Sequence, residues 1–315
     1  EKFIRENPGS IAPLINLAIV KQTIGELEES KKIYDKLIKS NKFDVRLYYG
    51  LYTLDPKNLN DQIFKNLNEI KVNKKLNLYE DGIINFLLSK NEKKNKRYKD
   101  ELEYLKKSHK SIFDLNYAYN TSSQFYYKKI IGQNFNKIQI EEKNLKDIQQ
   151  NQIEPIFIVG LPRSGSTLVE SILTSTVEKV NSYGESHCVN MAILDQIGPK
   201  IYKTNFDYKK FKFELNFEKL NKNIINRYSE LNIKEKNTKK FIDKSLENLF
   251  NLEIILNIFP KAKFLHTFRN PRDAVISIYQ SMLPDLSWTH SIEDIVNYFN
   301  KYLEVINFYK NKYPK

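Results

Sequence analysis

The stretch that most constrains the fold runs from Pro155 to Val169 and reads PIFIVGLPRSGSTLV. Its apolar run Ile156–Val159 predicts a strand that is buried on both faces. Two glycines then enclose a tight turn, and the residues from 168 to 173 have the apolar spacing of a helix. A strand, a glycine turn and a helix in this order direct backbone N–H groups and a helix N-terminus at an anion. We therefore expect an anion-binding loop, with an ordinary strand-to-helix turn as the alternative.

This loop differs from the ATP-binding P-loop at one decisive position. Gly160, Gly165 and Thr167 match the spacing of the P-loop, but Ser166 stands where the pattern has a lysine. That lysine normally contacts the β- and γ-phosphates, so its absence argues against an ordinary nucleoside triphosphatase. The cation lies inside the loop instead, at Arg163.

The segment PRSGST at 162–167 resembles the 5′-phosphosulfate loop of sulfotransferases that use PAPS (3′-phosphoadenosine 5′-phosphosulfate). It looks most like the loop of the tyrosylprotein sulfotransferases and of those linked to tetratricopeptide (TPR) repeats. The resemblance implies a catalytic role for Arg163. It also implies a set of residues that bind PAPS and its product PAP, namely Arg163, Ser164, Gly165, Ser166 and Thr167.

A second motif, RNPRDAVIS, runs from Arg269 to Ser277 and resembles the 3′-phosphate motif of the same enzymes. It follows a predicted strand at 261–268, and Pro271 and Asp273 suit the first turn of a helix. Two helical turns bring Ser277 back to the side of the strand end. An arginine can hold a phosphate with two N–H groups, which a lysine cannot. The resemblance thus implies that Arg269 and Ser277 bind the 3′-phosphate.

Two further positions carry the catalytic expectations of this resemblance. Lys244 ends a short predicted strand and matches the family lysine that faces the bridging oxygen of the leaving group, with an ordinary solvated lysine as the alternative. Glu185 follows Gly184 at about the distance of the family's general base, although the family has two glutamates there. The family base therefore aligns equally with Ser186, and Glu185 has the alternative role of capping a helix that starts near residue 189. His187 is an alternative base because of its ordinary pKa.

The fold expected for the second half is a three-layer α/β domain, P-loop-like, around a short parallel sheet. Three strands lead to the loop, to Lys244 and to Arg269, so the site lies at their carboxyl ends. We place this sulfotransferase domain at 153–315, after a polar linker at 134–152. The sequence starts with Glu1 and lacks the last strand and helices of the family, so we expect a fragment.

The first half, residues 1–133, predicts an α-helical TPR-like solenoid. Helical stripes flank Gly25 at a spacing close to one TPR unit, and five more such stripes follow down to residue 132. An irregular helical bundle is the alternative. A solenoid predicts contacts with other proteins and favours a peptide or protein acceptor by analogy.

Composition limits the other possibilities. The net charge is +13, but much of the lysine is mixed with Glu and Asn along helical stretches such as 91–110, which favours a solvated face over a nucleic-acid patch. The single Cys188 excludes an intramolecular disulfide and a multi-cysteine zinc site. No apolar run approaches the ~18–20 residues that span a bilayer. We expect a cytoplasmic protein with no nucleic-acid partner and no membrane segment.

These observations favour transfer of a sulfuryl group from PAPS to a hydroxyl, without a metal. The acceptor stays open between tyrosine in a peptide, a sugar hydroxyl and a small lipid or phenol. A P-loop kinase or nucleoside triphosphatase is the first alternative, for which Asp243 is the only stand-in for a magnesium-binding acid. The second alternative is a TPR scaffold whose α/β half has lost its activity.

Overall fold

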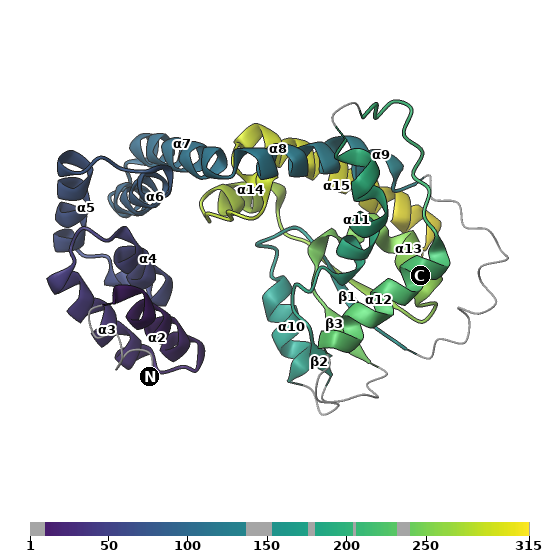
Figure 1. Ribbon diagram of the computed structural model, residues 1–315, viewed down its shortest axis with the longest axis horizontal. Helices are drawn as coiled ribbons and strands as arrows, with labels where there is room; N and C mark the ends of the chain where they lie inside the picture. The colour runs from purple at the N-terminus through teal and green to yellow at the C-terminus, as the bar shows by residue number, and fades with distance from the viewer. Residues whose placement is uncertain (1–9, 137–152, 176–179, 204–205, 232–239, 315) are drawn as a thin grey trace. The chain divides into compact units, whose positions relative to one another are not determined.

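The computed structural model describes residues 10–136, 153–175, 180–203, 206–231 and 240–314. The chain divides into two compact units, Glu1–Tyr117 and Ala118–Lys315 (Figure 1). We describe each unit by itself.

The first unit is helical, and its helices follow one another in chain order (Figure 1). Neighbouring helices pack against each other, as α2 does against α3 and α6 against α7. The helical stripes of the sequence therefore correspond to real helices, while their assignment to TPR repeats stays a prediction. The elements are α2 (Ile11–Thr23), α3 (Leu27–Ser40), α4 (Val45–Leu54), the short 3-10 helix η1 (Pro56–Asn58), α5 (Asp61–Asn73), α6 (Leu78–Lys94) and α7 (Tyr98–Leu115).

Local sequence signals explain where these helices begin and how closely they pack. Asn77 and Glu80 form a capping box at the start of α6, because each side chain accepts a hydrogen bond from the other's backbone N–H. Gly25 separates α2 from α3 with a φ of 87°, a conformation that favours glycine. The ring of Tyr34 lies against Gly50, where an added Cβ would come within 2.3 Å of it. The contact between Tyr34 and Gly50 packs α3 closely against α4.

The second unit combines helices with a parallel sheet. Its first part is helical: α8 (Tyr117–Phe125), the π-helical segment η2 (Tyr126–Ile131) and α9 (Gly132–Asn134). The remaining elements are β1 (Ile156–Gly160), α10 (Ser166–Thr174), β2 (Asn181–Ser182), α11 (Cys188–Ile201), α12 (Phe217–Leu231), β3 (Phe241–Asp243), η5 (Leu246–Asn251), α13 (Leu252–Ile258), β4 (Lys263–Thr267), α14 (Pro271–Tyr279), η6 (Ser287–Thr289) and α15 (Ile292–Lys312).

The sheet has the order β2-β3-β1-β4, and all its neighbouring strands are parallel. β1 is central and buried on both faces, since Phe157 and Val159 alternate with the equally buried Ile158. Phe157 and Val159 pack into the same core as residues of α11, α12 and α15. The parallel sheet expected from the sequence is thus present, and the carboxyl ends of its strands share one edge.

The segment 118–136 differs from the sequence interpretation, which divided it between the helical region and the linker. These residues pack with the second unit. Phe135 is buried in its core, and its backbone oxygen accepts a hydrogen bond of 3.2 Å from Tyr309 Oη. Residues 137–152, the rest of the expected linker, lie outside the described residues.

Candidate active site

The anion-binding loop predicted from the sequence spans residues 161–165, between the end of β1 and the start of α10. Gly160, Arg163 and Gly165 have φ angles of 153°, 64° and 93°. A Cβ atom at Gly160 would lie 2.5 Å from the backbone oxygen of Thr267, so this position accommodates only glycine. A Cβ at Gly165 would meet nothing within 4 Å, so the N-terminus of α10 is open there. The left-handed backbone of Arg163 is uncommon for a residue with a side chain, and such positions cluster at functional sites.

The three hydroxyl-bearing residues of the loop and the start of α10 differ in their contacts and burial. Ser164 Oγ donates to the backbone oxygen of Leu161 at 2.6 Å and lies 2.7 Å from Thr267 Oγ1 on β4. It therefore fixes the loop to the neighbouring strand. Ser166 is buried, whereas Thr167 is exposed. Thr167 is thus the more exposed of these two residues, and the expected roles of both in binding stay predictions.

The loop and the second motif meet, although more than 100 residues separate them in the sequence. Arg163 Nε donates to Ser277 Oγ at 3.4 Å, and Arg269 Nη1 donates to the backbone oxygen of Arg163 at 3.4 Å. The parallel pairing of β1 with β4 explains this proximity, since it places both strand ends at one edge. Asn270 caps α14, and Pro271 and Asp273 lie in its first turn, as the sequence indicated for these two residues. Two arginines and a serine thus converge on one exposed surface.

Lys244 is a buried cation held by two carboxylates. It follows β3 directly, and its side chain is 9% exposed. Its Nζ lies 2.8 Å from Glu185 Oε1 and 3.6 Å from Glu170 Oε2. The alternative of an ordinary solvated lysine is therefore wrong. The capping role considered for Glu185 is also wrong, because His187 is the N-cap of α11 and Glu185 pairs with Lys244.

Glu170 is a residue that the sequence reasoning missed. It lies on α10, four residues after Ser166, and its side chain is 17% exposed. Ser182 Oγ donates a hydrogen bond to Glu170 Oε1 and accepts one of 3.1 Å from the backbone N–H of Gly184. The one signal in the sequence is a carboxylate one turn after the loop, on the same side of the helix as Ser166.

Asp243, the stand-in metal ligand of the kinase alternative, is fully buried and serves as a structural acceptor. Its Oδ2 accepts hydrogen bonds of 2.6 Å from both Ser186 Oγ and Tyr228 Oη. Its Oδ1 accepts from Ser245 N at 2.7 Å and from Asn248 Nδ2 at 3.3 Å. Both oxygens are therefore occupied. Among the described residues, no group of three or more His, Cys, Asp or Glu side chains has an arrangement that could hold a metal ion.

His187 lies beside the site in a pair with Glu247. His187 Nδ1 contacts Glu247 Oε1, and its backbone N–H donates to Ser245 Oγ at 2.8 Å. The hydrogen bond to the Glu247 carboxylate raises the pKa of His187, which favours the imidazolium. Its φ of 55° is left-handed. His187 Nδ1 is thus engaged by Glu247, while Glu185 is engaged by Lys244, and both residues remain candidates for the general base.

Trp288, the only tryptophan in the chain, packs rather than lining an open surface. Its ring is buried and stacks on Tyr298, with centroids 3.8 Å apart and planes 2° apart. Tyr298 lies on α15, so the stack attaches the segment before α15 to that helix.

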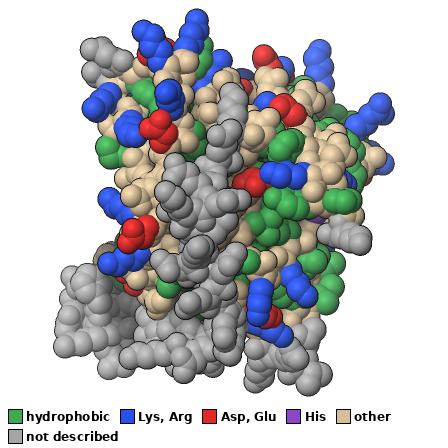
Figure 2. Space-filling view, turned by 90° about the vertical axis from the view of Figure 1, so that its right-hand side faces the viewer, with side chains coloured by type: hydrophobic (Ala, Val, Ile, Leu, Met, Phe, Trp, Pro, Cys, Tyr) green, Lys and Arg blue, Asp and Glu red, His purple; other side chains and the backbone are tan. Residues whose placement is uncertain are grey.

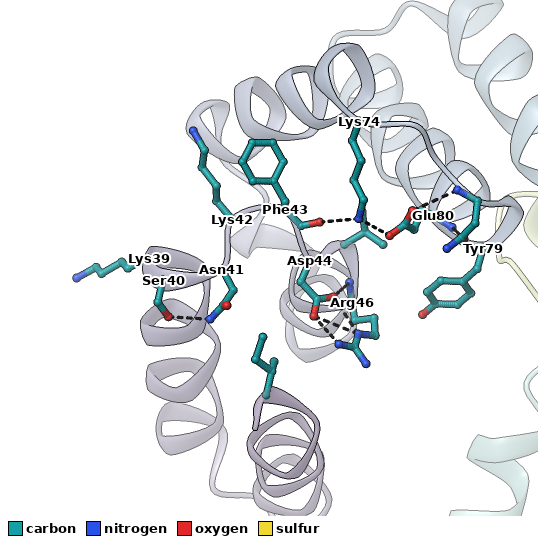
Figure 3. Close-up of a pocket in the computed structure, with 13 residues that line it drawn as sticks. Lys39, Ser40, Asn41, Lys42, Phe43, Asp44, Arg46, Lys74, Tyr79 and Glu80 are labelled. Atoms are coloured by element: carbon teal, nitrogen blue, oxygen red, sulfur yellow. Dashed lines mark hydrogen bonds and ion pairs between the residues drawn. The ribbon is translucent and has the colours of Figure 1, made fainter. Parts of the chain in front are cut away.

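The first unit contains a separate polar cavity of about 830 Å³ (Figure 3). Most cations around it already have acidic partners: Arg46 pairs with Asp44 and Lys74 with Glu80, in both cases at 2.6 Å. Lys42 pairs outside the cavity lining, with Glu69. The residues that line the cavity come from the ends of neighbouring helices: Ile11, Lys39, Ser40, Asn41, Lys42, Phe43, Asp44, Val45, Arg46, Lys74, Asn77, Tyr79 and Glu80.

Part of the basic excess lies in ion pairs on helix surfaces. On the face shown in Figure 2, lysine and arginine side chains are scattered among hydrophobic and uncharged ones. Several cations form ion pairs on their own helix, such as Lys106 with Glu103 and Lys110 with Asp114. This agrees with the interpretation of solvated faces. The described helices include none with the length and apolar character needed to cross a bilayer.

Comparison with known proteins places this geometry in a family. No solved structure matches the chain. An uncharacterized protein of Aquifex aeolicus (strain VF5) is 28% identical over 285 residues, which cover 87% of this chain and 35% of that protein. The chain thus spans about a third of the length of this relative. Residues 155–315, just over half of the chain, match the sulfotransferase family. This match covers the loop, Lys244 and the Arg269–Ser277 motif, and the chain belongs to the sulfotransferase family.

Proposed function

We propose that the chain transfers a sulfuryl group from PAPS to a hydroxyl acceptor. The observation that carries this proposal is the convergence of Arg163, Arg269 and Ser277 at the sheet edge where Lys244 also lies. Family membership supports sulfuryl transfer in general. The choice of PAPS rests on the two anion-binding motifs.

The residues at this edge fit a ligand that is anionic at two separate points. The open N-terminus of α10 and Arg163 would hold the 5′-phosphosulfate, since backbone N–H groups at a helix start favour anions. Arg269 and Ser277 would hold the 3′-phosphate. PAPS supplies the activated sulfuryl group when it is bound.

Each catalytic side chain then has one task. Glu185 accepts the proton of the acceptor hydroxyl, whose oxygen forms a bond to sulfur as the bond between sulfur and the bridging oxygen of PAP breaks. Lys244 and Arg163 place positive charge near the bridging oxygen, where negative charge increases. Glu185 Oε1 is hydrogen-bonded to Lys244 at 2.8 Å, so acceptance of the proton at this oxygen requires that Glu185 first release Lys244. Its side chain is 56% exposed, so it has room to turn toward an acceptor.

The acceptor and its partners form a further part of the proposal. Helical units that stack in chain order offer surfaces for peptides, and the polar cavity of the first unit, with its asparagine and tyrosine side chains, suits a polar segment (Figure 3). We therefore propose a peptide or protein acceptor ahead of a sugar or a small phenol. The cytoplasmic location expected from the sequence stays a prediction, which fractionation of the source cells and immunoblotting would test.

The test is a pair of measurements on the full-length protein. Calorimetry should show binding of PAP, and ATP with magnesium should bind more weakly. Mass spectrometry of peptide, sugar and phenol acceptors incubated with PAPS should show a gain of one SO₃ group. Binding of ATP with magnesium in preference to PAP, together with transfer of phosphate, would overturn the proposal.

A further inference from the structure

Lys244 has more negative charge around it than one ammonium requires. Its Nζ contacts carboxylate oxygens of both Glu185 and Glu170, at 2.8 and 3.6 Å. The two carboxylates differ in environment, because the Glu170 side chain is largely buried and that of Glu185 is mostly exposed. A buried ammonium needs an anionic partner, since an unpaired charge removed from water is costly.

The two carboxylates also differ in how firmly they are held. Ser182 donates to Glu170 and accepts from the backbone of Gly184, whose own oxygen accepts a 2.8 Å hydrogen bond from Lys244 N. Glu170 is therefore linked through Ser182 and Gly184 to the backbone of Lys244. Among the described residues, Lys244 is the one hydrogen-bond partner of Glu185.

We propose that Glu170 is a positioning residue that holds the ammonium of Lys244 at the end of β3 when Glu185 turns away to accept a proton. This inference rests on the proposed function. Glu170 lies one helical turn after Ser166, so the helix that presents the anion-binding loop also fixes the cation that acts on the leaving group. Glu170 thereby keeps the anion-binding loop and the ammonium of Lys244 in a fixed relative position.

The experiment compares Glu170→Gln, Lys244→Met and the double variant in the full-length protein. Glu304→Gln is the matched control, because Glu304 lies on α15 in an exposed ion pair with Lys301. We expect Glu170→Gln to lower kcat with PAPS by up to roughly 10²-fold, the cost of a misplaced catalytic group. The KM for PAPS should stay within about threefold of the wild type, since Glu170 has no expected contact with the nucleotide. The control should leave kcat unchanged.

The double variant separates positioning from general damage. If Glu170 acts through Lys244, the double variant should have the kcat of Lys244→Met alone, because the two effects are not additive. A kcat for Glu170→Gln within twofold of the wild type, or losses that multiply in the double variant, would overturn the inference. The inference would also be overturned if Glu170→Gln lowered kcat and Tm together, and by the same amounts whether Lys244 is present or replaced by Met.

Thermal unfolding gives a readout that does not depend on activity. Lys244→Met leaves Glu170 buried without its cation, so it should lower Tm, and adding Glu170→Gln should recover part of that loss. If the wild type transfers no sulfuryl group while this recovery is seen, the proposed function fails but the pairing stands. If the wild type is active and no recovery occurs, the positioning role fails and the function stands.

Discussion

Lys244 Nζ lies 2.8 Å from Glu185 Oε1, so the expected cation for the leaving group and the expected base neutralise each other. In the proposed reaction both need new partners, Lys244 the bridging oxygen and Glu185 the acceptor proton. Glu185→Gln should therefore keep PAP binding and lower kcat by roughly 10²–10⁴-fold, the range for a general base. Steady-state kinetics and calorimetry would check this. A near-normal kcat would move the base role to His187.

The guanidinium of Arg163 should matter more for rate than for binding. Arg163→Ala removes one preorganised donor, so kcat should fall by roughly 10²–10³-fold. PAP affinity should fall less, because the N–H groups at the start of α10 remain. Kinetics with PAPS and calorimetry with PAP on the same preparation separate the two effects. A loss of affinity as large as the loss of kcat would contradict a role in the transition state.

The second motif should set nucleotide selectivity. PAP should bind at least tenfold more tightly than 5′-AMP, since charge-assisted hydrogen bonds to the 3′-phosphate contribute roughly 1.5–3 kcal/mol each. Ser277→Ala should narrow this ratio, and Arg269→Ala should narrow it further. Competition calorimetry measures the ratio of PAP to AMP affinity in the wild type and in both variants. Equal affinities for PAP and AMP in the wild type would remove the assignment of the 3′ site.

The His187–Glu247 pair should make stability depend on pH. The pKa of His187 is raised in the folded protein. The contribution of the pair to the free energy of unfolding is therefore fully present below the ordinary histidine pKa of about 6.5, and it is lost as pH rises through the pKa of folded His187. His187→Asn tests this, since asparagine tolerates the left-handed backbone at this position. The difference in Tm between wild type and variant should be largest near pH 6 and shrink toward pH 9. A difference that grows with pH would reverse the assignment.

Removal of divalent metal should leave sulfuryl transfer unchanged. The positive charge at the site comes from Arg163, Lys244 and Arg269, and the carboxylate of Asp243 is fully engaged by protein donors. Rates with PAPS should thus be equal with EDTA and with added magnesium. An absolute requirement for magnesium would favour phosphoryl transfer.

The sequence predicted those parts of the site that depend on local structure. The strand, the glycine turn and the helix around Arg163 are specified by residues next to one another, and the same holds for the motif from Arg269 to Ser277. Glu170 escaped notice because its role depends on Ser182 and Lys244, which reach it only through the sheet. Contacts between residues that are far apart in the sequence leave no periodic pattern in it.

The helical segment before the sheet shows the same limit. Apolar periodicity predicted helices near 122–132, but periodicity does not say which core receives the apolar stripe. The polar neighbours of Phe135 in sequence favour a linker at this position, yet Phe135 packs with Tyr309 and Phe308 on α15. One buried aromatic ring in a polar stretch carries too little pattern to reveal this packing.

The hydrogen bond between Arg163 and Ser277 has a consequence for competition among ligands. An anion that binds Arg163 through Nε has to replace this bond, and Ser277 then loses its partner. A nucleotide with phosphate groups at both ends offers a new partner to each side chain, so its binding breaks one internal contact and satisfies both residues. Inorganic sulfate and phosphate, which are single small anions, should therefore compete less well for Nε of Arg163 than a nucleotide with phosphate groups at both ends.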